Sequence, residues 1–257
     1  MTKTERLIRL FGKQIAQGEY GPGPLPSEAE LCERFDASRN VMREVVKVLS
    51  TKRLIDAQPH RGLFVMPREK WNFLDVDVLA WALEKGDDPQ LINSLIEVRG
   101  LIEPSISRWA AERATAVDLV AIEASFNEME ANVENREIFH EADIRFHKAI
   151  LLATHNVVIQ QLSDAISALQ RAIFDHTFLA EKRHMELTMR EHADLFDAIR
   201  RKNPEAAELA CHDMVQHTAG RAKAKPESKA SPTLGANSSP GKKKAPVPSK
   251  REPVRMG

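Results

Sequence analysis

The feature that most constrains this chain is a stretch near its N-terminus, residues 24 to 65, in which helix and strand signals follow a fixed order. The run PLPSEAELCERF contains the capping box Ser27-x-x-Glu30, whose two side chains can satisfy each other's unpaired amides. An Asp-Ala pair then predicts a turn, and Ser38 is a favoured N-cap for a second helix. The runs IDAQ and LFV predict two short strands joined by PHRG. Helix, turn, helix and two-stranded wing together are typical of a DNA-binding domain.

The second predicted helix has one apolar face and one basic face. Its apolar stripe comprises Val41, Val45, Val48 and Leu49. A recognition helix presents its first turns to base edges in the major groove, and a basic wing tip can reach phosphates or the minor groove. We therefore expect DNA contacts from Arg39, Asn40 and Arg43 and from the wing tip at His60, Arg61 and Gly62. The alternative is an ordinary amphipathic helix pair that carries arginines on its solvent face.

Charged residues are distributed unevenly along the chain, although the formal net charge is zero. Residues 1–70 hold 13 Lys/Arg against 9 Asp/Glu, a balance of +4, whereas residues 71–220 hold 14 against 26, a balance of −12. Residues 221–257 hold 10 against 2, a balance of +8. A basic N-terminal part favours contact with phosphates, and the acidic middle part argues against DNA binding there.

Length and composition indicate one large domain or two ordinary ones, since the chain has 257 residues, of which 42% are hydrophobic. Cys32 and Cys211 lie far apart in predicted helices, and we expect both to be reduced thiols. No apolar run approaches the roughly 20 residues that a membrane-spanning helix needs. The N-terminus is charged and lacks the apolar segment of a signal peptide, so a cytoplasmic location is expected.

Beyond residue 75, helical periodicity replaces the strand signals. We predict a mainly α chain, in which an N-terminal winged helix-turn-helix precedes an antiparallel bundle of about seven helices. The helices are expected at 76–85, 89–113, 116–133, 135–154, 156–180, 185–201 and 204–219. The predicted domains are a winged helix (1–68), a linker (69–75), a helical domain (76–220) and a disordered basic tail (221–257). The tail is assigned as disordered because it is rich in Lys, Pro, Ser, Ala and Gly and has no aromatic residue.

Several of these runs resemble a known family. LPSEAEL, SRNVMREVVKVL and GLFV resemble the winged-helix domain of GntR-type bacterial transcription regulators, over roughly residues 4 to 66. EVRGLIEP, DIRFH and EHADLFDAI resemble the helical ligand-binding domain of the FadR subfamily. The resemblance implies a homodimer that binds an imperfect palindrome in double-stranded DNA and responds to a small molecule. It also implies that Ser38 contacts DNA together with the recognition-helix and wing residues named above. Ala29 stands where the subfamily carries a DNA-contacting arginine, so the operator sequence is left open.

A candidate metal site can be named from the residues themselves. Asp143 and His147 lie four residues apart on one face of a predicted helix, and His192 lies on a later helix. One carboxylate and two imidazoles that converge in a bundle can hold a divalent metal ion. The alternatives are an ion pair on a helix face or a capped core histidine.

The same three residues define a rival function, a metal-dependent helical enzyme that acts on small acids and carries a basic N-terminal appendage. No H-E-x-x-H motif, no activated Ser or Cys and no Gly-rich phosphate loop supports it. We therefore assign no catalytic residue and predict that the protein is not an enzyme.

The resemblance adds a ligand set, because many members of the subfamily bind a divalent metal such as zinc through one Asp and three His. Asp143, His147 and His192 match three of these four positions, and the fourth falls on Met214. His212 and His217 flank it but face elsewhere on the helix. A weakly held metal, a shell completed by water or effector, and a metal-free site all remain open.

The effector is implied by a narrower likeness. WNFLDVDVLAW and RWAAERAT are similar to sugar-acid-responsive members of the family. This implies a repressor of sugar-acid catabolism that a sugar acid such as D-galactonate releases; an activator is the alternative. Arg99 can grip a carboxylate as a bidentate partner, or pair with a nearby glutamate. The predicted effector contacts are Arg99, Asp143, His147, Asn156, Phe178, Thr188 and His192. The alternative for Asn156 is a helix stop.

Overall fold

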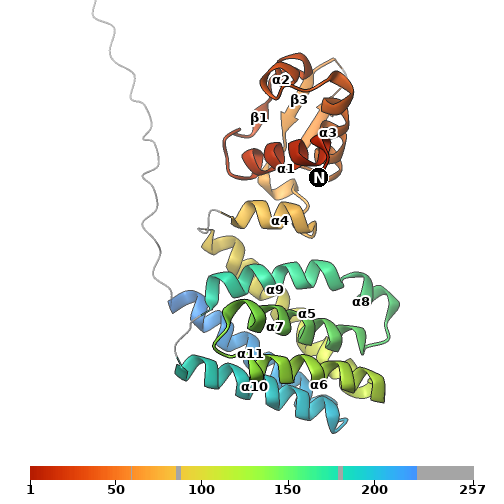
Figure 1. The fold of residues 1–257 in the computed structure, drawn as a ribbon, viewed down its shortest axis with the longest axis vertical. Coiled ribbons are helices and arrows are strands. Elements are labelled where there is room, and N and C mark those ends of the chain that lie inside the picture. Colours follow the sequence, from red (N-terminus) through yellow and green to blue (C-terminus); the bar gives the residue numbers. More distant parts are fainter. Residues whose placement is uncertain (59, 85–87, 179–181, 225–257) are drawn as a thin grey trace, which may run out of the picture. The chain divides into compact units, whose positions relative to one another are not determined.

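The N-terminal part of the chain is a small helical domain with a three-stranded sheet (Figure 1). The computed structural model describes residues 1–58, 60–84, 88–178 and 182–224. The elements of this part are α1 (Lys3–Ala16), β1 (Gly23–Pro24), α2 (Glu28–Arg34), α3 (Arg39–Thr51), β2 (Ile55–Gln58) and β3 (Gly62–Val65). The predicted helix-turn-helix and both predicted strands are therefore present.

The sheet contains one strand more than the sequence indicated. β3 lies in the middle and pairs antiparallel with both β1 and β2. In the short pairing with β1, Gly23 lies opposite Val65, and the Leu25 amide donates to the Leu63 carbonyl at 2.8 Å. A two-residue strand of Gly and Pro carries no apolar alternation, which is why its pattern predicts a turn rather than a strand.

The helices of the N-terminal part enclose one apolar cluster. Phe11, Leu31 and Leu49 are fully buried in it, and burial of each such side chain contributes about 1.5–3 kcal/mol. The buried face of α3 differs by one position from the predicted stripe. Met42 and Val46 are buried with Val45 and Leu49, whereas Val41 and Val48 are only partly buried.

Helix α4 (Val76–Leu83) belongs to the same apolar cluster, which contains its Val78 and Trp81. A Cβ on Gly12 would overlap the Trp81 ring, so a glycine in the middle of α1 permits this close packing. Asp75 caps α4, and its carboxylate accepts from Lys52 Nζ at 2.7 and 2.8 Å. α4 was predicted to begin the helical domain at residue 76. In the structure it also packs on the N-terminal part, through apolar contacts and through the ion pair at its cap.

The remaining described residues form a helical bundle. Its helices are α5 (Pro89–Arg113), α6 (Ala116–Ala131), α7 (Arg136–Leu152), α8 (Val157–Gln161), α9 (Ser163–Thr177), α10 (Lys182–Arg200) and α11 (Pro204–Ala224). α5 packs along α11, α6 along α7, and α10 along α11 (Figure 1). The core between them includes Ile122, Met129, Phe139, Phe146, Leu195 and Ile199. No helix among the described residues is both long enough and apolar enough to cross a membrane.

Two predicted helix boundaries in the bundle were wrong. The helix expected over 156–180 is two helices, because the Leu162 amide bonds to the Ile159 carbonyl three residues back and tightens the turn between them. α11 continues through Ala224, so residues 221–224 are helical and do not belong to a disordered tail. The rest of the predicted tail, the wing residue Pro59 and residues 85–87, at the junction of the first two helices predicted after residue 75, lie outside the described residues.

Candidate functional site

The start of α3 presents the predicted DNA-contacting residues to solvent. Ser38 caps the helix by accepting from the Val41 amide, and this cap directs the first turn outward. Ser38, Arg39, Asn40 and Arg43 are all exposed. Arg43 lies 3.4 Å from a carboxylate oxygen of Glu28 on α2, a weak contact that phosphates or bases can displace.

The connection between β2 and β3 is an exposed tight turn. His60 has φ 62° and Gly62 has φ 94°, so both residues adopt left-handed backbone conformations. His60, Arg61 and Gly62 are exposed, and the Arg61 guanidinium lies 5.8 Å from the centre of the Phe64 ring. The wing thus offers a positive charge on a narrow tip, as the sequence predicted. Contact with DNA remains a prediction for all seven residues.

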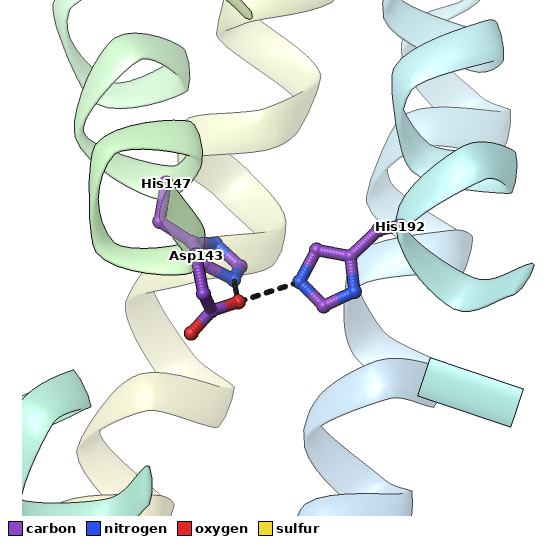
Figure 2. A group of neighbouring side chains, drawn as sticks. All are labelled: Asp143, His147 and His192. Carbon is purple, nitrogen blue, oxygen red and sulfur yellow. Dashed lines mark hydrogen bonds and ion pairs between the residues drawn. The ribbon is translucent and has the colours of Figure 1, made fainter. Parts of the chain in front are cut away.

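The three predicted metal ligands converge inside the bundle. Figure 2 shows Asp143 and His147 on α7 facing His192 on α10. Asp143 Oδ1 lies 2.8 Å from His192 Nε2 and 3.6 Å from His147 Nε2. Both histidines are buried, and one ligand atom from each residue lies within 4.8 Å of the others.

The charge state of this cluster suits a cation. Burial by itself would raise the pKa of the Asp143 carboxyl, but the hydrogen bond from His192 and the positive charges nearby hold it below its usual range. Burial lowers the pKa of the His147 imidazole to about 4, so the ring is neutral near pH 7. A carboxylate beside a neutral imidazole is the form in which these side chains bind metal.

The orientation of His192 points the same way. Its Nδ1–H donates to the Thr188 carbonyl at 2.7 Å, which leaves Nε2 facing the Asp143 carboxylate. The Thr188 carbonyl and the Asp143 carboxylate can only accept hydrogen bonds. Either a second ring proton or a cation shared with Asp143 must therefore lie at Nε2 of His192. Metal-bound histidines are commonly held by such a bond from the other ring nitrogen. The donor set therefore fits a divalent ion.

The fourth position is occupied by Met214, whose side chain is buried in the bundle core. His212 is exposed and bonds to Asp213, while His217 bonds to Glu191. Neither histidine belongs to the cluster. A thioether is a poor ligand for a borderline ion such as zinc, so an ion held by the other three residues would have coordination sites left for water or for an effector.

A cavity of about 60 Å³ opens beside this cluster. Besides the three candidate ligands, its walls include Arg99, Phe178 and Thr188 from the predicted effector contacts. Asn156 does not line it. That side chain caps α8 by accepting from the amides of Val158 and Ile159, which accounts for its position in the sequence. The contact predicted for Asn156 is therefore replaced by a helix cap.

Arg99 already has a carboxylate partner. Its Nε and Nη2 donate to the two oxygens of Glu103 at 2.7 and 2.9 Å, one helical turn along α5. Burial works against the charged guanidinium, but the neighbouring Glu103 carboxylate outweighs it and raises the pKa of Arg99. The bidentate pair occupies the Nε–Nη2 edge of the guanidinium, which leaves only the Nη1–Nη2 edge for a ligand carboxylate. The glutamate alternative named for Arg99 is thus what the structure contains.

Sequence reasoning missed a second cation at the cavity, Arg221 on α11. It is partly buried, and its Nη2 donates to Thr218 Oγ1 at 2.9 Å. Met214, Thr218 and Arg221 line the cavity together at helical spacings of four and three. That spacing was readable, but the predicted helix ended at residue 219, before Arg221.

Both parts of the described chain match known protein families. Residues 3–65 match the bacterial regulatory proteins of the gntR family, and residues 94–217 match the FCD domain. The chain is 54% identical to the galactonate operon transcriptional repressor of Escherichia coli (strain K12) over 224 residues, which cover 87% of this chain and 98% of that protein. It is 31% identical to the uncharacterized HTH-type transcriptional regulator YieP of the same organism, across 82% and 91% of the two chains.

One solved structure supports the same architecture. It is the structure whose title states that Lar controls expression of the Listeria monocytogenes agr system, and it superposes with a TM-score of 0.63. It covers 88% of this chain and 99% of that one at 16% sequence identity. At this identity the likeness supports the shared fold alone.

Proposed function

Since the chain belongs to the GntR family of bacterial transcription regulators, we propose that it is a repressor that a sugar acid releases from its operator, with D-galactonate as the first candidate. The observation that carries the effector half of this proposal is the cavity beside Asp143, His147 and His192, with Arg221 in its wall. This combination of a cationic side chain, imidazoles and a candidate metal site suits a ligand with one carboxylate and several hydroxyls.

The chain is a transcription regulator and not an enzyme. Its relatives are named as repressors, activators or regulators, and its domains are those of the gntR family. Asp143, His147 and His192 therefore belong to a binding site, and the rival assignment to a helical enzyme lacks support.

The DNA-binding step follows from the N-terminal part. Two copies of the winged helix on a homodimer would place two α3 helices in successive major grooves of an imperfect palindrome. The exposed residues at the start of α3 would read base edges, and Arg61 on the wing would meet phosphates or the minor groove. Because a bacterial operator lies in the cytoplasm, we place the homodimer there as well.

The effector-binding step follows from the cavity. Asp143, His147 and His192 would hold the metal, which when bound supplies a positive charge for the ligand carboxylate. Arg221 is a further cation for the same carboxylate, since one edge of the Arg99 guanidinium is already paired with Glu103. Thr188 can exchange hydrogen bonds with hydroxyls, and Phe178 can pack on the apolar edge of the carbon chain. Release requires that the effector bind the DNA-incompetent geometry better than the competent one.

The proposal is tested by titrating D-galactonate into a gel-shift or fluorescence assay of operator binding. We expect the apparent operator Kd to rise about 5–150-fold, the usual range of allosteric coupling. D-gluconate and L-lactate serve as comparison ligands. If no sugar acid changes operator binding, the effector assignment is wrong while the assignment to the family stands.

A second prediction concerns the recognition helix. Arg43→Ala is expected to weaken binding to the operator by about 1–3 kcal/mol and binding to random duplex DNA much less. Lys47→Ala, an exposed basic residue on the same helix, is the matched control. Fluorescence anisotropy with both duplexes at one salt concentration measures the difference. An equal loss on the two duplexes would show that Arg43 contacts phosphate instead of a base.

A further inference from the structure

Two buried hydrogen-bond acceptors in the cavity wall lack a donor among the described residues. They are Oε1 of Gln170 on α9 and Oε2 of Glu191 on α10. Gln170 is 3% exposed and Glu191 is 7% exposed, and both side chains line the cavity. Buried acceptors are nearly always satisfied in folded proteins, so two in one polar cavity indicate that something else completes them.

The acceptor on Gln170 is fixed by its neighbours. Its Nε2 donates to Glu103 Oε1 at 3.1 Å, and Glu103 is held in turn by Arg99. A carboxylate can only accept, so the amide nitrogen must face Glu103 and the amide oxygen must face away from it. The Arg99–Glu103 pair thus sets the orientation of a carbonyl oxygen in the cavity wall.

The acceptor on Glu191 is fixed by a different partner. Its Oε1 accepts from Nδ1 of His217 on α11, which leaves Oε2 buried. Glu191 lines the same cavity as Thr188 and the candidate metal ligand His192, which also lie on α10. Neither a ligand carboxylate nor a metal-bound oxygen of that carboxylate can donate to these two acceptors.

We propose that Gln170 Oε1 and Glu191 Oε2 accept hydrogen bonds from two hydroxyls of the effector and so restrict the cavity to polyhydroxy acids. This inference rests on the proposed sugar-acid function and specifies which part of the ligand is read. The cations of the cavity attract the effector carboxylate, but every small acid has a carboxylate, so this attraction does not discriminate among acids. The two acceptors give selectivity, because an acid without distal hydroxyls would leave both oxygens buried and unpaired.

The test compares two ligands on the full-length, zinc-loaded protein by isothermal titration calorimetry. D-galactonate and 2-hydroxyhexanoate share six carbons, a carboxylate and an α-hydroxyl, but only the first has hydroxyls further along. We expect the wild-type protein to bind D-galactonate at least about 100-fold more tightly. Gln170→Met and Glu191→Met are each expected to weaken D-galactonate binding at least about tenfold while changing 2-hydroxyhexanoate binding less than about threefold. Glu191→Gln, which keeps an oxygen acceptor, should retain part of the selectivity.

Two exposed positions on the helices nearby give matched controls, Gln161→Met on α8 and Asp194→Met on α10, and neither should change binding. Operator binding without effector shows that each variant is folded. Selectivity that survives in both cavity variants overturns this inference and leaves the proposed function standing. A wild-type protein that binds no sugar acid overturns both. A wild-type preference for an amino acid analogue over D-galactonate, lost in Glu191→Met, would assign the acceptor to an ammonium group and also overturn it.

Discussion

Replacing Glu103 with alanine is expected to lower the free energy of unfolding by about 3–5 kcal/mol, because Arg99 would be left buried without a counter-ion. Arg99 and Glu103 are 7% and 5% exposed, and two hydrogen bonds join them within one turn of α5. Burial opposes the charged form of both groups. Each nevertheless has its pKa shifted towards that form by the other, since the pKa of Arg99 is raised and that of Glu103 is lowered.

Urea denaturation followed by circular dichroism measures this loss. The double variant Arg99→Met, Glu103→Met is the control, since it removes both charges and replaces them with apolar side chains of similar length. It is expected to unfold at a higher urea concentration than Glu103→Ala alone. Equal stability of Glu103→Ala and wild type would mean that water reaches Arg99 and that the pair contributes little.

Replacing His192 with alanine is expected to lower zinc affinity by more than about 100-fold, because removing only a hydrogen-bond partner of a metal ligand already costs about 10–100-fold. The variant leaves Asp143 and His147 as the only protein ligands of the cluster, and it also removes the hydrogen bond that orients Asp143. We expect the same variant to stay bound to its operator at D-galactonate concentrations that release the wild type.

Zinc titration with a competing chelator measures the affinity, and the gel-shift titration measures operator release. His212→Ala is the matched control, since His212 is exposed on α11 and lies outside the cluster. Unchanged zinc affinity in His192→Ala would show that the ion binds elsewhere. Normal release by D-galactonate without zinc would show that Arg221 alone is sufficient for the carboxylate.

The DNA-binding part was predictable because its signals are local. The capping box at Ser27 and the cap at Ser38 each join residues three positions apart, and both are present in the structure. The turn of the wing is equally local, since His60 and Gly62 adopt the left-handed conformations that such a connection requires. The strand β1 was missed because its pairing with β3 joins residues about 40 positions apart.

The candidate metal cluster was predictable in part. The spacing of Asp143 and His147 puts both on one helix face, but only the family resemblance suggested that His192 on α10 would meet them. The structure brings the three together, and no fourth histidine among the described side chains joins them. The sequence already showed methionine, Met214, where the subfamily has its fourth metal ligand. The structure adds that this side chain is buried.

The sequence by itself determined the winged helix, the order of the bundle helices and the faces that the candidate ligands occupy, because caps, turns and periodicity act over three or four residues. Only the tertiary structure decided which charges reach the cavity. Arg99 pairs with Glu103, Asn156 caps a helix, and Arg221 lines the cavity from a helix that extends further than its composition suggests. Such choices depend on side chains from α5, α9, α10 and α11 meeting in one buried space, where every charge and acceptor competes for the same few partners.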